Sequence, residues 1–407
     1  MTLSREFLRA SIESLFSSRE SSASARRIGA EIELIPFDEA TRRVVPAFSP
    51  NGRGSVDVIR LVSRRGGWTE ISNGDDPPSW CLPDGGRLTF EPGGQIELSS
   101  APSDNPSKLI RDLQCTAQLL TSSFTSAGFL LESVGADPYN DVSDVELQLH
   151  RPRYERMTRY FESIGDSGIR MMRQTASIQL CVDPGEKPLE RWMLLNRLAP
   201  YVTAIFANSR VYNERLTDYQ SYRSHFWRTL DTSRTGSFSP DDAAVDSYLD
   251  FALGAGAIMR DADRYSSFGD WIREGNPSAQ DWEFHLSTLF PEVRPRGYFE
   301  VRSADAIDPE LLAAPICFIA GLAYDDTSTR DAMELLAEVT PPSLDAAGLE
   351  GLHNREIQHV ATQLIDIAIA GCESLGESYI SPSDIEIASD FFERYTHRGR
   401  SPGDDRS

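Results

Sequence analysis

Residues 28–35 of the chain read IGAEIELI, and this short stretch decides the kind of fold that the sequence predicts. Side chains two residues apart on a β-strand point to the same face. The four apolar residues at the even positions therefore share one face, and Glu31 and Glu33 share the other with Gly29. The stretch predicts a strand that buries one face in the core and presents two carboxylates on the opposite face.

Three further segments repeat this alternation: residues 95–99 (QIELS), 172–180 (MRQTASIQL) and 298–302 (YFEVR). Any one of them could be a half-buried strand with a solvated polar face. An ordinary solvated face is typically mixed with Lys, however, and none of the four segments contains one. Their polar faces carry Glu, Arg, Gln and small hydroxyl groups, which are the groups that hold metal ions and anionic substrates.

The remaining patterns predict an α+β fold, an antiparallel sheet backed by helices. Strands and helices do not alternate regularly, no glycine fingerprint follows the first strand, and no GxxxxGK[ST] phosphate loop is present. Residues 48–87 are rich in Gly, Pro, Asp and Asn and predict turns and short strands. Strands are predicted at 28–36, 88–91, 95–99, 129–134, 169–182 and around Glu300. Helices are predicted at 1–18, 105–127, 151–164, 188–208, 309–323, 328–338, 354–374 and 382–397, and a short helix or turn at 224–230.

Composition excludes several classes of protein. The net charge of −22 repels a phosphate backbone, so nucleic acid is not expected as a partner. No apolar run reaches the roughly 18–20 residues that a membrane helix needs, and the first 16 residues lack the apolar core of a signal peptide. We therefore expect a cytoplasmic protein. The five cysteines have no CxxC spacing, which indicates neither a zinc site nor a disulfide framework.

The acidic and basic groups of these strands suit the ligation of a carboxylate to an amine. The carboxylate must first be activated, usually as an acyl phosphate formed from ATP, and the triphosphate needs divalent metal ions. Mg²⁺ takes oxygen ligands. The candidate ligands are Glu31, Glu33, Glu91, Glu97 and Glu300, joined by Gln179. Substrate carboxylates and phosphate oxygens need fixed cations, for which the candidates are Arg173, Arg223, Arg234 and Arg302, with Thr175 on the same strand face as Arg173 and Gln179.

Five ordered blocks between residues 28 and 325 resemble the glutamate–cysteine ligase family of plants and many bacteria, including the actinobacterial branch that feeds ergothioneine synthesis. The blocks are GAEIE (29–33), LTFEPGGQIELSSAP (88–102), MRQTASIQLCVD (172–183), SYRSHFWRTLDTSRTG (221–236) and WEFHLSTLFPEVRPRGYFEVRSADA (282–306). FEPGGQIELS is the most specific piece.

The resemblance implies a curved antiparallel sheet like that of glutamine synthetase and the guanidino kinases, with metal ions and ATP on its concave face. It implies that glutamate is activated as γ-glutamyl phosphate, which the amine of cysteine then attacks. In this comparison Glu31 and Glu33 match the first metal-binding pair, and Glu91, Glu97 and Glu300 match later acidic ligands. Arg223 and Arg302 match the arginines expected near the substrate carboxylate and the transferred phosphate.

One stretch departs from the family pattern. The family usually reads NSP and then a Gly-rich segment before its S-x-R-x-x-x-W, whereas here Asn208-Ser209 is followed by Arg210 and then by VYNERLTDYQ. Arg223 and Trp227 keep the expected spacing. Because this loop is expected to help form the substrate pocket, a different amine acceptor in a specialised pathway is the alternative to cysteine.

Several residues allow two interpretations. His285 is a ligand or a hydrogen-bonded structural histidine, and Trp227 and Trp282 pack either on a substrate or in the core. Cys317 and Cys372 are expected to be buried thiols. We expect residues 1–400 to form a single catalytic domain, with the sheet-based site at about 28–305, a helical part at about 309–397 and a disordered tail at 398–407. A monomer or a homodimer fits equally well.

Overall fold

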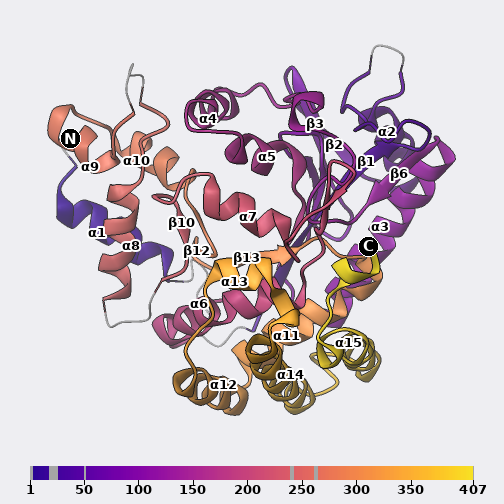
Figure 1. Cartoon of the computed structure of the whole chain (residues 1–407). Helices are drawn as coiled ribbons and strands as arrows, with labels where there is room; N and C mark the ends of the chain where they lie inside the picture. Colours follow the sequence, from indigo (N-terminus) through magenta and orange to yellow (C-terminus); the bar gives the residue numbers. More distant parts are fainter. Residues whose placement is uncertain (1–2, 18–25, 50–51, 239–242, 261–264, 407) are drawn as a thin grey trace.

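The computed structural model describes residues 3–17, 26–49, 52–238, 243–260 and 265–406. In this part of the chain, a sheet of nine antiparallel strands forms the centre of the fold (Figure 1). Its order is β12-β13-β7-β1-β5-β4-β3-β2, and β6 also pairs with β1. The strands are β1 (Ile28–Asp38), β2 (Thr69–Asn73), β3 (Asp76–Cys81), β4 (Arg87–Phe90), β5 (Ile96–Ser99), β6 (Phe129–Glu132), β7 (Ser177–Val182), β12 (Val293–Pro295) and β13 (Phe299–Asp305). The predicted α+β class is confirmed.

The apolar face of the sheet packs on helices, as the strand alternation predicts. Ile32, Leu98, Leu180 and Val301, from four different strands, join one large hydrophobic core. The helices α3 (Pro106–Ser126), α6 (Pro188–Ile205) and α11 (Ala313–Tyr324) contact this sheet directly. A second layer packs on α11 and consists of α12 (Asp326–Glu338), α14 (Arg355–Leu375) and α15 (Pro382–Arg394). These helices gather at the bottom of Figure 1.

The opposite, polar face of the sheet lies beneath a different set of helices. They are α1 (Arg5–Leu15), α4 (Pro152–Glu162), α5 (Ser167–Gln174), α7 (Tyr222–Thr229), α8 (Ala244–Gly254) and α10 (Ala279–Leu286), and α9 (Phe268–Glu274) packs on α8. Helices α1, α8, α9 and α10 form a group at one end of the molecule (Figure 1). Helix α1 lies within the predicted 1–18 helix, of which residues 1, 2 and 18 fall outside the described residues. Helices α8 to α10 occupy a region for which no element was predicted.

Two local predictions were wrong. Residues 169–182 are not one strand, because α5 runs to Gln174 and only β7 is extended. Ile169 and Met172 recur at helical spacing among good helix formers, and this signal outweighed the alternation that continues from β7. Residues 48–87 also contain a helix, α2 (Ser55–Gly66), whose Val56, Ile59 and Val62 are buried at helical spacing.

The C-terminal residues differ from the predicted disordered tail. Within the described residues, which end at Arg406, the chain forms a short 3-10 helix from Pro402 and buries Ser401. Arg210 reaches Asp404 at 2.7 Å, and Asp405 accepts hydrogen bonds from Arg394 and from the hydroxyl of Tyr395. The charged composition that indicated disorder is matched by basic partners on the body of the protein, so the tail is ordered.

The remaining elements are short. Strands β8 (Val211–Tyr212) and β9 (Arg215–Leu216) form a hairpin, and β10 (Thr235–Gly236) pairs with β11 (Phe290–Pro291). Helix α13 (Leu344–Leu349) packs on α6 and α7. Among the described residues no helix is both long and apolar enough to cross a membrane.

Candidate active site

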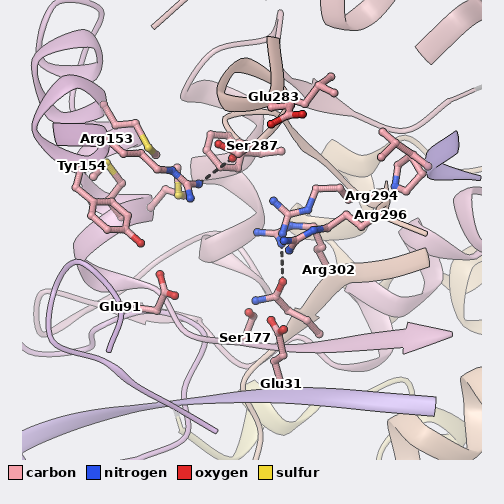
Figure 2. A pocket seen from close by; sticks show the side chains of 18 of the residues that line it. Glu31, Glu91, Arg153, Tyr154, Ser177, Glu283, Ser287, Arg294, Arg296 and Arg302 are labelled. Carbon is pink, nitrogen blue, oxygen red and sulfur yellow. Dashed lines mark hydrogen bonds between the residues drawn. The ribbon is translucent and has the colours of Figure 1, made fainter. Parts of the chain in front are cut away.

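A cavity of about 830 Å³ lies over the polar face of the sheet. Its base comes from β1, β5 and β7, and its sides come from α1, α4, α5, α7, α8, α10 and the segment that carries β12 (Figure 2). Most of the charged residues that line it belong to two groups. The carboxylate floor is Glu31, Glu33, Glu91 and Glu97, and the arginine wall is Arg294, Arg296 and Arg302. The alternating strands therefore bring the predicted acidic residues together over one cavity.

The carboxylate floor is assembled by strand register. Glu33 on β1 lies directly opposite Glu97 on β5, and Glu91 follows the end of β4. Burial, together with the nearby carboxylates of Glu97 and Glu300, raises the pKa of Glu31 to about 8. Burial and Glu97 likewise raise the pKa of Glu33 to about 7. Burial also raises the pKa of Glu91 well above its usual range.

Hydrogen bonds orient two of these carboxylates and leave the others available. Glu33 accepts from the backbone N–H of Ser177 at 2.8 Å and from Nε2 of Gln179 at 3.0 Å. Glu97 accepts from the hydroxyl of Thr89 at 2.7 Å. Within the described residues, the Glu31 carboxylate accepts no hydrogen bond from the protein. Carboxylate oxygens whose negative charges repel one another are suitable ligands for a hard divalent cation such as Mg²⁺.

The arginine wall is organised around one fully buried carboxylate. Glu300 on β13 has 0% exposure and does not itself line the cavity. It contacts Arg294 at 2.7 Å, Arg302 at 2.6 Å and Arg296 at 3.6 Å. Burial acts to raise the pKa of Glu300, but the three guanidinium groups outweigh burial and lower the pKa to about 2. Three cations around one anion leave net positive charge that faces the cavity, which suits a phosphate or a substrate carboxylate.

Gln179 joins the floor to the wall. Its Nε2 donates to Glu33, and its Oε1 accepts from Nη1 of Arg302 at 2.5 Å. Thr175 also lines the cavity, but its hydroxyl donates to the carbonyl of Met171 at 2.7 Å. The predicted residue Gln179 thus lies at the centre of the cavity base, and Thr175 lies at its edge on the boundary between α5 and β7.

Arg223 and Trp227 lie on α7, next to the wall. The indole of Trp227 lines the cavity, and the Arg223 guanidinium is 4.4 Å from its ring centroid. Arg223 is 3% exposed, donates to the carbonyl of Arg302 at 2.8 Å and is 3.8 Å from Asp305. It does not line the cavity, so the structure places it behind Arg302.

The other two predicted arginines lie outside the cavity. Arg173 is on α5 and donates to the carbonyl of Val145 at 3.3 Å. Arg234 has 0% exposure, and its guanidinium donates to Asp231 and to the carbonyls of Thr288 and Gly256. Both guanidinium groups therefore donate to other parts of the protein, and neither lines the cavity.

The surroundings of His285 and Trp282 favour the structural interpretation of both residues. His285 is buried, its Nε2 lies 2.7 Å from the carbonyl of Ala252, and burial lowers its pKa to about 3. The indole N–H of Trp282 donates to the hydroxyl of Ser11, although an edge of this ring reaches the cavity. Cys317 and Cys372 are buried free thiols, as expected.

Sequence reasoning missed several cavity residues, among them three arginines and a tyrosine. Arg294 and Arg296 flank Pro295 two positions apart, so the alternation rule applied to RPR would have placed them on one face. Arg153 and Tyr154 come from α4, on the opposite side of the cavity, and Arg153 donates to the carbonyl of Ser287, just after the end of α10, at 2.8 Å (Figure 2). No signal in the helical stretch 151–164 distinguished these two from other surface residues.

The loop that departs from the family pattern does not form the cavity, which corrects the prediction made for it. Residues 209–221, all of them described, include the β8-β9 hairpin, and none of them lines the cavity. They pack instead beside Asp305, which accepts hydrogen bonds from Ser209 and Ser221. The departure therefore changes a supporting loop and not the cavity wall.

Comparisons with known proteins agree with one another. Residues 27–370 match the family model described as "Glutamate-cysteine ligase family 2(GCS2)". The chain is 30% identical over 385 residues to the glutamate–cysteine ligase EgtA of Mycolicibacterium smegmatis, which covers 88% of this chain and 87% of the relative. It is 28% identical over 381 residues to the chloroplastic glutamate–cysteine ligase of Medicago truncatula, with 86% and 73% covered.

Solved structures share the fold at low sequence identity. A glutamate–cysteine ligase of Francisella tularensis in complex with AMP matches with a TM-score of 0.52 and 13% identity, covering 94% of this chain and 84% of that one. A bifunctional glutathione synthetase of Pasteurella multocida matches with a TM-score of 0.56 and 13% identity, covering 98% of this chain and 51% of that one. At this level of identity, these two matches support the fold and nothing more.

Proposed function

The chain belongs to glutamate-cysteine ligase family 2, and we propose that it forms γ-glutamylcysteine from glutamate, cysteine and ATP. The family match and the named relatives support this function. The observation within the molecule that carries it is the carboxylate floor facing the arginine wall across one cavity. This arrangement offers a site for metal ions beside a site for anions, and a triphosphate with its metal ions needs both.

We propose that Glu31, Glu33, Glu91 and Glu97 hold Mg²⁺. The oxygen-only donor set and the raised pKa values of three of these carboxylates support a cationic ligand. When bound there, Mg²⁺ would supply positive charge to offset that of the triphosphate. A metal role for Glu300 stays a prediction: an arginine contacts each of its oxygens, and each oxygen keeps a second lone pair.

The proposed reaction has two steps. The γ-carboxylate of glutamate attacks the γ-phosphorus of ATP, the bond from that phosphorus to the bridging oxygen breaks, and ADP leaves. Arg294 and Arg302 orient the transferred phosphoryl group and stabilise its charge, while Arg223 supports Arg302 from behind. The amine of cysteine, after losing its proton to solvent, attacks the acyl carbon. The carbon–oxygen bond to phosphate then breaks, the nitrogen releases a second proton, and the amide remains.

Cysteine is the favoured amine acceptor. The loop at residues 209–221, which departs from the family pattern, was the reason for considering a different amine acceptor, and it does not line the cavity. The curated relatives are named as glutamate–cysteine ligases. The wider predictions of a single catalytic domain, a monomer or homodimer and a cytoplasmic location stay predictions. Support for the single domain comes from the core, which runs from Leu8 on α1 to Phe392 on α15.

Product analysis with purified protein tests the proposal. ADP release should require glutamate, cysteine and Mg²⁺ together, and mass spectrometry should identify γ-glutamylcysteine. A panel of other amines at equal concentration serves as the control. Turnover with another amine but none with cysteine would overturn the cysteine assignment, and ADP release without an amide product would overturn the ligase assignment.

A further inference from the structure

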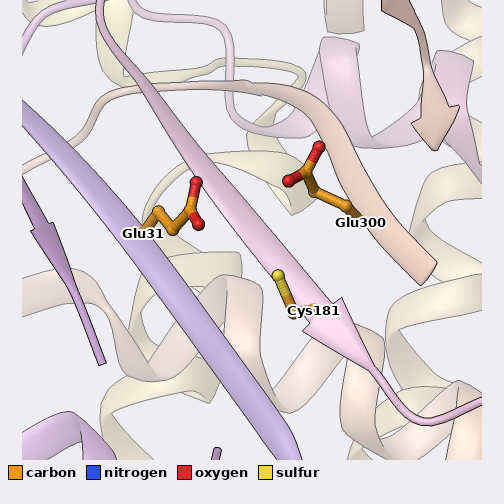
Figure 3. A group of neighbouring side chains, drawn as sticks. All are labelled: Glu31, Cys181 and Glu300. Carbon is orange, nitrogen blue, oxygen red and sulfur yellow. The ribbon is translucent and has the colours of Figure 1, made fainter. Parts of the chain in front are cut away.

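A thiol lies on the same sheet face as the floor, and neither the proposed reaction nor the predicted metal set uses it. Cys181 is on β7, two residues after Gln179, and is partly exposed. Its Sγ and one carboxylate oxygen each of Glu31 and Glu300 all lie within 4.8 Å of one another (Figure 3). Three adjacent strands, β1, β7 and β13, therefore bring one sulfur and two oxygens to a common point.

Strand register holds this group in place. Cys181 lies directly opposite Glu300 on β13, and opposite Gly29 on β1. A side chain at Gly29 would begin 3.5 Å from the Cys181 Cβ, so the glycine leaves the flank of the thiol open. Glu31 is two residues further along the same face of β1. The group is thus set by backbone pairing and not by flexible loops.

These three ligand groups favour a different class of cation than the carboxylate floor does. Mg²⁺ takes oxygen ligands and has little affinity for sulfur, whereas Zn²⁺ and Cd²⁺ bind thiolates well. Glu31 accepts no hydrogen bond within the described residues and is available as a ligand. The Glu300 oxygens contact arginines at 2.6 Å and longer, and each carboxylate oxygen has a second lone pair.

We propose that Glu31, Cys181 and Glu300 bind one thiophilic divalent cation, Zn²⁺ or Cd²⁺, and that this cation inhibits the ligase by occupying Glu31. On binding, the S–H bond of Cys181 breaks, a sulfur–metal bond forms and the proton leaves to water. The inhibition rests on the proposed function. The binding does not, because it requires no substrate and no turnover.

The binding test is a titration of metal-free protein with Cd²⁺ alone, followed by the ultraviolet absorption of the cadmium–thiolate bond. We expect one equivalent to bind in the wild type and in the control Cys115→Ser, which removes an exposed thiol. The absorption should be lost in Cys181→Ser, and Glu31→Gln should weaken binding about tenfold or more. Equal absorption in Cys181→Ser and the wild type would overturn the site, as would loss of the signal in Cys115→Ser alone.

The inhibition test uses the intact enzyme at saturating Mg²⁺ and follows amide formation while Zn²⁺ is added. For each protein the rate is compared with its own rate without Zn²⁺. Cys181→Ser should need at least about tenfold more Zn²⁺ for half inhibition, and Cys115→Ser should match the wild type. Cadmium binding at Cys181 without any difference in zinc inhibition would overturn the inhibitory role and leave the site. A protein without ligase activity would still report the site through absorption.

Discussion

The carboxylate floor and the arginine wall face each other across one cavity, yet only the wall contains its own counter-charge. Glu300 lies among three guanidinium groups, and its pKa falls to about 2. Glu31 and Glu33 have no such arrangement, and their pKa values rise to about 8 and about 7. The charge of the wall is thus balanced within the protein, whereas the floor needs protons or a cation to balance its charge. The two regions should respond differently to substitution, to pH and to metal ions.

The largest effect should come from the floor. Glu33→Gln keeps the size of the side chain and removes the charge, so it should lower the Mg²⁺-dependent kcat/KM by about 100- to 1,000-fold. Coupled ADP-release kinetics measure this loss, and circular dichroism should show an unchanged fold. Glu39→Gln, an exposed position just past the end of β1, is the matched control. Near-normal turnover of Glu33→Gln would remove this carboxylate from the metal site.

A smaller loss should follow from a charge-conserving change in the wall. Arg302→Lys keeps the positive charge but replaces the planar guanidinium, whose Nη1 contacts both Gln179 and Glu300, with a single ammonium that leaves no second nitrogen for phosphate, so kcat should fall by about 10- to 100-fold. Steady-state kinetics at varied ATP measure this effect. Arg273→Lys, an exposed arginine on α9, is the control and should behave like the wild type. Equal activities in the two variants would contradict the proposed phosphate contact.

The floor and the wall also differ in how pH affects the metal-free protein. The pKa values of Glu31 and Glu33 are raised above their ordinary 4.5, so the folded state binds more protons than the unfolded state at intermediate pH. The free energy of unfolding should therefore fall as pH rises from about 5 to 8, because deprotonating these two carboxylates costs more in the folded than in the unfolded state.

Urea unfolding at pH 5.5 and 8.5 in EDTA measures this fall. Addition of Mg²⁺ should reduce the difference, because a cation offsets the repulsion among the carboxylates. Glu33→Gln should reduce it too, because Gln does not titrate. A stability that increases with pH across this range in EDTA would contradict the raised pKa values.

The smallest effect should come from an arginine that the sequence placed in the site and the structure places outside it. Arg173→Gln should leave kcat/KM within about threefold of the wild type, because the guanidinium contacts a backbone carbonyl and does not line the cavity. The same coupled assay measures it. A loss as large as that expected for Arg302→Lys would show that Arg173 reaches a substrate after all.

The floor was predictable from sequence, and most of the wall was not. Period-two alternation is a local rule, and it located Glu31, Glu33 and Glu97 because each sits on a strand whose neighbours are apolar. Arg294 belongs to a strand of three residues that ends at Pro295, and Arg296 follows it, so the strand is too short for the pattern to be recognised. The prediction for Arg173 has the opposite problem: it extends the alternation of β7 across the boundary at Gln174 into a helix.

Long-range pairing was beyond the reach of local patterns. Nothing local indicates that Asp404 and Asp405 meet basic partners such as Arg210 and Arg394, and so the tail was predicted to be disordered. Likewise, the position of Cys181 opposite Glu300 depends on the register of β7 with β13, which no single segment specifies.

The amide of Gln179 has a further consequence for the order of events in the cavity. One side chain donates to Glu33 and accepts from Arg302, and it has one orientation that satisfies both. Rotation toward either neighbour withdraws it from the other. If a cation binds at the floor and an anion at the wall, as proposed, this amide links the two binding events, and by reciprocity each changes the affinity for the other by the same factor.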